Sequence, residues 1–284
     1  MKKQTRIKIL LLFVVILCAI LFLLLRTNSE PFDSNVNSQL KVFIYENSMD
    51  ETRTHNLEKL LSKFDYDYEV LGKGDVWNGW YGRAQKYIES LNNCDEDTYV
   101  LFLDGRDVIP NKSKDDFMRT AVNACEPDKI VFNAESACCN VGSEFNGTES
   151  ERHNHIEQIK QHFKSIKGDI ETEYAFLNFG IMFGKCKNFK NMFSIMNMKP
   201  GDDDQGLITQ KIMNGEFENY KLDYNNELFG IMFDEPRWDD ERKMYYNPNN
   251  SAYPSFFHFP GKTKWYETCI KQLFHEHLND NVFL

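Results

Sequence analysis

The sequence predicts an α/β domain with a mostly parallel, Rossmann-like sheet, preceded by one transmembrane helix. After residue 38, short apolar segments of strand length alternate with segments whose apolar residues recur at helical spacing. This β-α-β-α-β order is typical of a doubly wound sheet. The segment 99–103 is apolar throughout and ends at Asp104, as expected of a parallel strand buried on both faces. A continuous apolar run near the N-terminus indicates the membrane helix.

The N-terminal apolar run covers residues 9–25 and follows the basic residues Lys2, Lys3, Arg6 and Lys8. A membrane-spanning helix needs roughly 17 to 25 apolar residues, so this run suffices. A cleaved signal peptide is the competing interpretation, but the run ends in Leu-Leu-Leu-Arg, without the small residues of a cleavage site. Basic residues before the helix favour a cytosolic tail and a lumenal body. We therefore predict a tail (1–8), a signal anchor (9–25), a stem (26–38) and one body domain (39–284).

The body contains segments that match strands and helices in turn. Strands are predicted at 40–45, 67–71, 99–103, 129–135, 177–184 and 227–233. Helices are predicted at 54–64, 83–91, 155–163, 205–213 and 263–278, with one more opening at a capping box that starts at Ser113. Because ligands bind at the carboxyl ends of strands in open α/β sheets, polar residues that follow these strands are the first candidates for a site.

Composition narrows the classes of function. The 284-residue chain has a formal net charge of −10 at pH 7, which argues against nucleic acid as its main partner. Six cysteines follow the anchor without CxxC spacing, so they can form up to three disulfides or remain buried thiols. Glycosylation sequons at Asn111, Asn146 and Asn249 are usable only if the body faces the endoplasmic reticulum or Golgi lumen, or, for a viral protein, the host secretory system.

The first chemical candidate is Asp104-Gly105-Arg106-Asp107, directly after the apolar strand at 99–103. Two carboxylates in this place can hold a hard divalent cation, and the cation can bridge the phosphates of a nucleotide sugar. Gly105 permits the tight turn that such a pair requires. A solvated turn, with Arg106 pairing one of the acids, is the alternative.

Two further candidates follow. Asp202, Asp203 and Asp204 precede the predicted helix at 205–213, where acids are favoured as helix caps but three in succession exceed that need. The segment 258–264 (HFPGKTK) offers His258 as a metal ligand, Gly261 for close backbone approach and lysines for a diphosphate. A turn followed by a capped helix explains the same segment without function.

Taken in order, six segments resemble the glycosyltransferase domain of the procollagen lysyl hydroxylase/glycosyltransferase family and its viral and algal relatives. They are YVLFLDGRDV (99–108), IVFNAESACC (130–139), LNFGIMFG (177–184), DDDQ (202–205), KLDYNNELF (221–229) and HFPGKTK (258–264). The resemblance spans about residues 40 to 266. It implies a GT-A fold, a Mn²⁺ ion, a UDP-sugar donor (UDP-glucose or UDP-galactose) and a collagen-like or other glycoprotein acceptor.

The resemblance also implies roles for individual residues. Asp104, Asp107 and His258 match the family's metal ligands. Donor binding falls on Tyr45, Glu46, Asn47, Lys86, Asp104, Gly105, Gly261 and Lys264. Asp203, Asp204 and Asn178 match residues beside the sugar and acceptor, where transfer takes place.

Departures from the family concentrate on the acceptor side. Cys139 stands where the family usually has Trp, and Phe179-Gly180 replaces a two-glycine pattern. We expect no hydroxylase part, because the sequence has no H-x-D pair for a non-haem iron site. The sequence therefore predicts a stand-alone, membrane-anchored, metal-dependent hexosyltransferase. The alternatives are a GT-A-fold binding protein without turnover and a metal-dependent phosphoester hydrolase.

Overall fold

The computed structural model describes residues 39–136, 148–168, 173–231, 235–261 and 263–278. All of them belong to one compact unit, Gln39–Leu284. The predicted tail, anchor and stem lie outside the described residues, as do Cys138, Cys139 and Asn146. Within the described residues, no helix combines the length and the apolar character needed to cross a bilayer.

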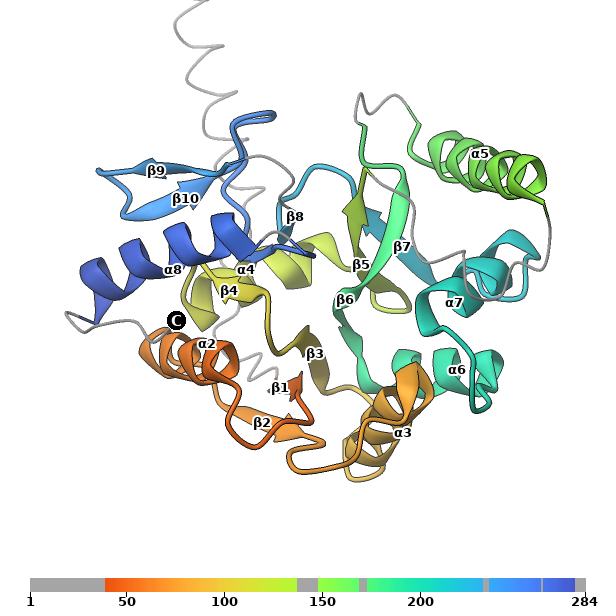
Figure 1. The fold of residues 1–284 in the computed structure, drawn as a ribbon, viewed down its shortest axis with the longest axis horizontal. Helices are drawn as coiled ribbons and strands as arrows, with labels where there is room; N and C mark the ends of the chain where they lie inside the picture. The colour runs from red at the N-terminus through yellow and green to blue at the C-terminus, as the bar shows by residue number, and fades with distance from the viewer. Residues whose placement is uncertain (1–38, 137–147, 169–172, 232–234, 262, 279–284) are drawn as a thin grey trace, which may run out of the picture. The chain divides into compact units, whose positions relative to one another are not determined.

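The centre of the unit is a sheet whose strands follow the order β2-β1-β3-β6-β5-β7 (Figure 1). Its strands are β1 (Leu40–Tyr45), β2 (Tyr68–Leu71), β3 (Tyr99–Asp104), β5 (Ile130–Glu135), β6 (Phe176–Lys185) and β7 (Tyr220–Asp223). β1 runs parallel to β2 and β3, and β5 runs parallel to β7. β6 is antiparallel to both of its neighbours. The sheet is therefore mixed, with the single reversal at its middle among the strands described.

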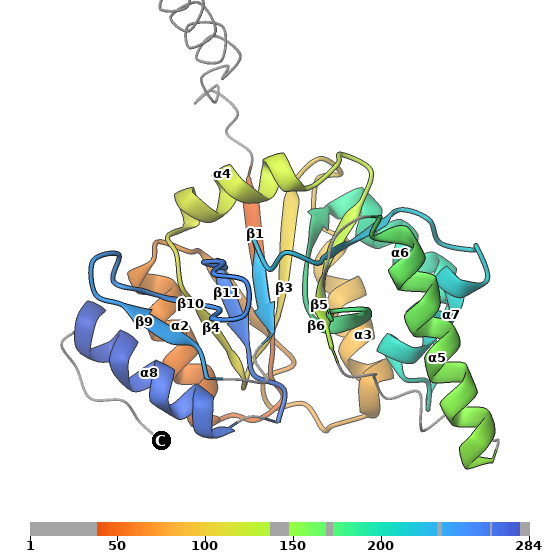
Figure 2. The same cartoon turned by 90° about the horizontal axis from the view of Figure 1, so that it is seen from above.

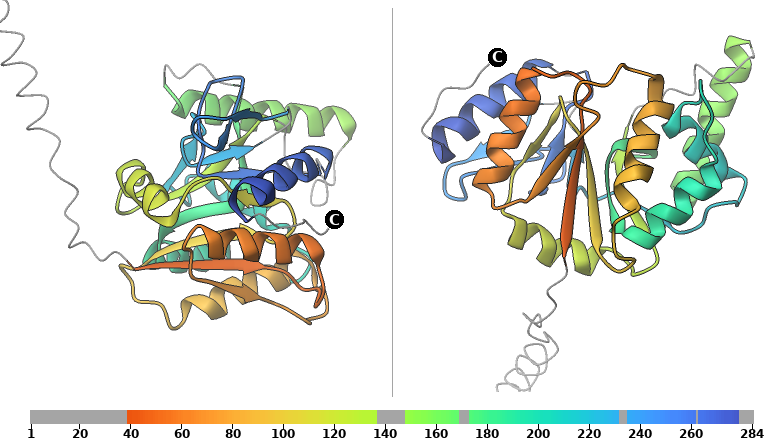
Figure 3. Two further views of the ribbon diagram at one scale, coloured as in Figure 1. Left: turned by 90° about the vertical axis from the view of Figure 1, so that its left-hand side faces the viewer. Right: turned by 90° about the horizontal axis from the view of Figure 1, so that it is seen from below.

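Helices cover both faces of this sheet (Figures 2 and 3). The helices are α2 (Thr52–Lys63), α3 (Gly79–Leu91), α4 (Lys114–Ala124), α5 (Glu149–Ile166), α6 (Cys186–Met196), α7 (Asp204–Met213) and α8 (Thr263–His277). Val100 and Phe102 of β3 pack with α3, α5, α6 and α7 on one face. Leu101 and Leu103 point to the opposite face and pack with α2 and α4. The alternation along β3 explains why its sequence is apolar without interruption.

Two smaller sheets complete the unit. β4 (Val108–Pro110), β11 (Phe256–His258) and β8 (Phe229–Ile231) form a three-stranded sheet in the order β4-β11-β8. β9 (Arg237–Asp239) and β10 (Met244–Tyr246) form a hairpin. A third hydrophobic cluster joins α8 to β11 through Phe257, Ile270 and Leu273. The C-terminal part of the chain is thereby held against β4, which directly follows the Asp104–Asp107 turn.

The predicted elements are largely confirmed, with differences at their ends. The helix predicted at 155–163 begins earlier, because Thr148 and Glu151 form a capping box that starts α5 at Glu149. Ser113 is the N-cap of α4, as predicted, and its hydroxyl accepts a hydrogen bond from the amide of Asp116. The strand predicted at 227–233 is described only as β8, since residues 232–234 lie outside the described part. Cys94, Cys125, Cys186 and Cys269 are buried free thiols.

Candidate active site

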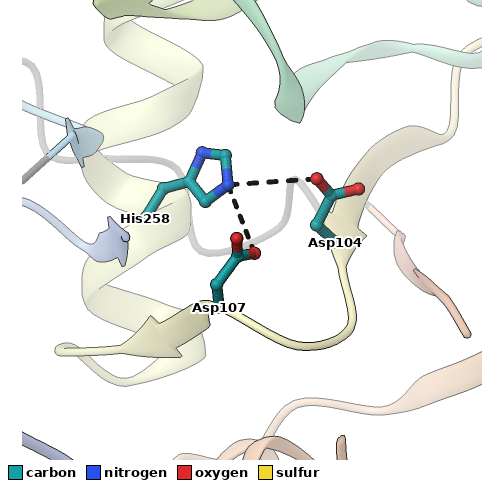
Figure 4. A group of neighbouring side chains, drawn as sticks. All are labelled: Asp104, Asp107 and His258. Atoms are coloured by element: carbon teal, nitrogen blue, oxygen red, sulfur yellow. Dashed lines mark ion pairs between the residues drawn. The ribbon is translucent and has the colours of Figure 1, made fainter. Parts of the chain in front are cut away.

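The three predicted metal ligands meet in space (Figure 4). One ligand atom from each of Asp104, Asp107 and His258 lies within 4.8 Å of the others. The Nε2 atom of His258 is 3.3 Å from Oδ1 of Asp107 and 3.9 Å from Oδ2 of Asp104. His258 is buried, and the two carboxylates are about three-quarters buried, with 26% and 25% of their side chains exposed.

Three strand termini build this group. Asp104 is the last residue of β3, and Asp107 stands immediately before β4. His258 ends β11, and its register partner in β4 is Val108, the residue after Asp107. At Gly105, which lies between the two acids, a Cβ atom would come within 2.7 Å of the carbonyl oxygen of Tyr45. The tight turn therefore requires glycine at this position, as the sequence predicts.

An irregularity in β6 leaves space beside the group. Phe132 of β5 pairs with Met182, but the next residue, Asn133, pairs with Asn178. The intervening residues of β6, 179–181, have no register partner in β5, which is the mark of a β-bulge. Gly180 lies in this bulge, and a Cβ atom there would be 2.8 Å from Oδ2 of Asp104 and 2.9 Å from Nε2 of His258. The missing side chain keeps the approach to the ligand atoms open.

The electrostatics of the group suit a cation. Burial lowers the pKa of His258, but Asp107 and Asp104 outweigh that effect and raise it overall. Burial raises the pKa of Asp107, but the nearby His258 outweighs it and the pKa is lowered overall. Burial raises the pKa of Asp104, partly offset by Arg83. Two carboxylate oxygens and one imidazole nitrogen are suitable ligands for Mn²⁺ or another divalent first-row transition-metal ion, and the carboxylates also suit Mg²⁺.

Arg83 of α3 links this group to the acidic block at 202–204. Its Nη1 atom donates to Oδ1 of Asp104 at 2.5 Å, and its Nε and Nη2 atoms donate to Oδ2 of Asp204 at 2.9 and 2.6 Å. The side chain is 5% exposed. Sequence reasoning missed this residue, because an arginine at the start of a predicted helix gives no signal that it points inward.

The three acids at 202–204 make different contacts. Asp203 is the N-cap of α7 and accepts a hydrogen bond from the amide of Gly206 at 2.6 Å. Asp202 accepts one from the amide of Lys199, which closes the preceding turn. Asp204 forms an ion pair with Arg83 at 2.6 Å. Helix capping therefore explains Asp203. Asp204 instead contacts Arg83, which in turn contacts Asp104 of the candidate metal-ligand group.

A cavity of about 510 Å³ opens above the carboxyl ends of β1 and β3. It is lined by Tyr45, Glu46, Asn47, Trp77, Trp80, Arg83, Asp104, Gly105, Arg106 and Asp107. The predicted nucleotide loop, Tyr45 to Asn47, thus shares one cavity with the two aspartates. Arg106 makes a bidentate pair with the buried Glu46, with both N–O distances 2.7 Å. This pair fixes the cavity rim, because a planar guanidinium matches a carboxylate in both direction and spacing.

Three of the residues predicted to bind the donor are not among the described residues that line this cavity. Lys86 pairs with Asp75 at 3.0 Å and with Glu89 at 3.3 Å, and it is not among the described residues that line the cavity. Gly261 has a φ of +66° and open space around it. Lys264 is exposed near the start of α8, with its ammonium 4.6 Å from the ring centroid of Trp265.

A second polar cluster lies where β5 and β6 enter the site. Glu135 accepts a hydrogen bond from Nε2 of Gln205 at 2.9 Å, and Oε1 of Gln205 accepts one from the amide of Phe179 at 3.0 Å. Asn178 is buried, and its Oδ1 atom accepts a hydrogen bond from the amide of Gly180. Burial raises the pKa of Glu135 to about 7, against smaller opposing effects of His258, Gln205 and Asn178. Glu135 lies in the segment 130–139, one of the six that resemble the family, but nothing in the sequence indicated that its side chain is buried.

No protein-family model matches the chain. The chain is 24% identical over 234 residues to a multifunctional procollagen lysine hydroxylase and glycosyltransferase of Caenorhabditis elegans. The match covers 74% of this chain and 29% of that protein, so the chain spans less than a third of its relative.

Two solved structures are also similar. One is a glycosyltransferase involved in the glycosylation of the major capsid of PBCV-1, with a TM-score of 0.46 and 11% identity over 81% of this chain and 98% of that one. The other is the apo structure of the bifunctional glycosyltransferase WbbM, with a TM-score of 0.41 and 10% identity over 84% of this chain and 50% of that one. The sequence match supports a glycosyltransferase-like domain, and the fold is an α/β fold with a mixed sheet, three of whose five pairings are parallel.

Proposed function

We propose that this chain is a metal-dependent glycosyltransferase with a GT-A fold. It transfers a hexose, glucose or galactose, from a UDP-sugar to a hydroxyl group of a protein-linked or glycan acceptor, including collagen-like hydroxylysine. The observation that carries the proposal is the Asp104–Asp107–His258 group, whose two aspartates line the same cavity as the predicted nucleotide loop. The procollagen-modifying relative supports the proposal, because its described activities include glycosyl transfer.

The residues of the proposed site have different roles in sugar transfer. Asp104, Asp107 and His258 would hold Mn²⁺, which stabilises the charge on the leaving diphosphate when bound. Tyr45, Trp77 and Trp80 give the cavity an aromatic wall against which a nucleoside can pack. Gly261 and Lys264 are proposed to approach the diphosphate, and Lys86 the donor. Holding donor and acceptor in one geometry supplies much of the rate enhancement of such a reaction.

On the acceptor side, Asn178 and the acid pair Asp203–Asp204 are proposed to orient the sugar or the acceptor hydroxyl. Glu135 extends this set, because its carboxyl is buried beside Gln205 and has a pKa near the physiological range. A carboxyl of this kind can take or give a proton at neutral pH, whereas an ordinary glutamate is fully ionised there.

We further propose that the body faces the lumen of the endoplasmic reticulum or Golgi, tethered by residues 9–25. The apolar run and the basic residues before it support this orientation.

The two described sequons differ in their exposure. Asn111 is 2% exposed, and its Nδ2 donates to the carbonyl oxygens of Tyr245 and Pro254. Asn249 lies in an exposed turn, so it is the sequon of the two described that a glycan can reach.

The test is the release of UDP from a panel of UDP-sugars by the full-length chain in mild detergent, with Mn²⁺ and then with a chelator. We expect Mn²⁺-dependent release from one UDP-hexose. Asp107→Asn removes a metal-binding charge at constant shape and should reduce release by at least about 100-fold. Asp115→Asn, at an acid in the first turn of α4, is the matched control and should retain full activity.

Other outcomes would identify the rival functions. UDP binding without release or transfer to any acceptor would indicate a binding protein. Metal-dependent cleavage of simple phosphoesters, with no preference for UDP-sugars, would indicate a hydrolase. Full activity of Asp107→Asn would refute the assignment of the metal ligands.

A further inference from the structure

Arg83 controls which oxygen of Asp104 is available to a cation. Nη1 of Arg83 donates to Oδ1 of Asp104, whereas Oδ2 of Asp104 is the oxygen that lies 3.9 Å from Nε2 of His258. One carboxylate oxygen is therefore committed to the guanidinium and the other faces the ligand group. In this arrangement Asp104 offers a single oxygen to a metal ion.

The far side of Arg83 is held by Asp204. Oδ2 of Asp204 accepts two hydrogen bonds from Arg83, and Oδ1 accepts one from the amide of Gln205 at 2.9 Å. Asp204 is 1% exposed, and Arg83 is 4% exposed. Both oxygens of Asp204 thus have partners, so its carboxylate serves as the counter-charge that anchors the guanidinium. This counter-charge role is additional to the place beside the sugar and acceptor that the family resemblance implies for Asp204.

Aromatic faces fix the plane of the guanidinium. Its central carbon is 4.5 Å from the ring centroid of Trp80 and 5.6 Å from that of Phe179. Phe179 belongs to the β6 bulge, next to Gly180. Contacts with two rings and with the carboxylates of Asp104 and Asp204 hold the guanidinium where it binds Oδ1 of Asp104.

We propose that Arg83 is a positioning residue that makes Asp104 a one-oxygen ligand and thereby sets the preference of the site for a small octahedral ion such as Mn²⁺ over Ca²⁺. This inference rests on the proposed metal-dependent function. Ca²⁺ takes six to eight oxygens, often with a bidentate carboxylate, whereas smaller ions bind fewer donors at shorter distances. Withholding one oxygen of Asp104 therefore disfavours Ca²⁺ in particular.

Charge and geometry can be separated experimentally. Removing the positive charge of Arg83 strengthens the attraction of the site for any divalent cation, and this effect is the same for Mn²⁺ and Ca²⁺ because both carry two charges. Releasing Oδ1 of Asp104 favours Ca²⁺ alone. The ratio of the two dissociation constants cancels the charge effect and reports the geometry.

The experiment measures Mn²⁺ binding to the full-length chain in mild detergent by electron paramagnetic resonance, with Ca²⁺ as competitor. Arg83→Gln should lower the ratio of the Ca²⁺ to the Mn²⁺ dissociation constant by about tenfold or more, the range typical of changes to a ligand's hydrogen-bond partner. Arg119→Gln is the matched control, because Arg119 makes an exposed pair with Asp116 on α4. Its ratio should equal that of the unmodified chain.

Arg83→Lys provides a second variant if Arg83→Gln does not fold. It keeps the charge but loses the planar fork that bridges two carboxylates, so its ratio should also fall. An unchanged ratio in a folded Arg83→Gln or Arg83→Lys chain would overturn the inference and leave the proposed function intact. Absence of Mn²⁺ binding in the unmodified chain would instead overturn the metal centre itself.

Discussion

Replacing Gly180 with alanine gives the most direct test of the site geometry. The added Cβ would lie 2.8 Å from Oδ2 of Asp104 and 2.9 Å from Nε2 of His258, and closer still to Cε1 of the same ring. Real Cβ atoms essentially never approach heavy atoms this closely, so the ligands or the β6 bulge must move. His258 is 3% exposed and has little room to do so.

The size of the effect follows from the cost of overpacking. Inserting a methyl group into a closely packed region costs about 1 to 3 kcal/mol. If the strain falls on the metal-binding arrangement, Mn²⁺ affinity falls by about 5- to 150-fold, since each 1.4 kcal/mol corresponds to a factor of about ten. Transfer should fall in parallel at subsaturating Mn²⁺.

The assay compares the melting temperature with and without Mn²⁺, together with direct Mn²⁺ binding. Gly184→Ala is the matched control on the same strand. Its Cβ would crowd the backbone at Lys129 and Ile130, at 3.0 and 3.2 Å, away from the ligand group. We expect the control to lose stability but to keep its Mn²⁺-dependent stabilisation. Wild-type Mn²⁺ affinity in Gly180→Ala would refute the reasoning that glycine keeps the approach to the ligands open.

Three further predictions concern other parts of the molecule. Burial raises the pKa of Glu135 from 4.5 to about 7, so its contribution to stability is fully present below pH 4.5 and is lost as the pH rises toward 7. Glu135→Gln should flatten the fall in the free energy of unfolding over that range by about 3 kcal/mol in urea titrations, and an unchanged pH profile would contradict this. Asn111→Ala should cost more than about 2 kcal/mol of stability by denaturant midpoint, because its amide satisfies the buried backbone groups of Tyr245 and Pro254. In secreting cells, Asn249→Gln should lower the glycan-dependent mass shift by one glycan, whereas Asn111→Gln should leave that shift unchanged; a glycan found on Asn111 would contradict this prediction.

The strands and the order of the site motifs could be predicted from the sequence, but fewer of the contacts between them could be. The strand at 99–103 and the acids after it were predictable because a buried apolar run and a glycine turn are local signals. His258 was predicted as a partner of the two aspartates from the order of the motifs, because no local pattern joins it to Asp107. Their proximity depends on the pairing of β11 with β4, which is a long-range contact.

Other features had no sequence signal of their own. The direction of β6 is not encoded in an apolar run, since a strand buried on both faces looks the same in either orientation. The bulge at 179–181 and the inward direction of Arg83 depend on neighbours that are distant in sequence. A match to a family position did not predict contacts either. Lys86 matches such a position, but its pairing with Asp75 and Glu89 was not predicted.

The pairing of β4 with β11 also has a consequence for the order of events during synthesis. Asp104 and Asp107 leave the ribosome long before His258, which lies near the C-terminus, and the third ligand arrives only when β11 docks. A nascent chain that has not reached β11 offers a divalent ion two carboxylates and no imidazole. The proposed ion would therefore meet its three ligands together only after β11 has docked, and its binding would stabilise that docked arrangement by mass action.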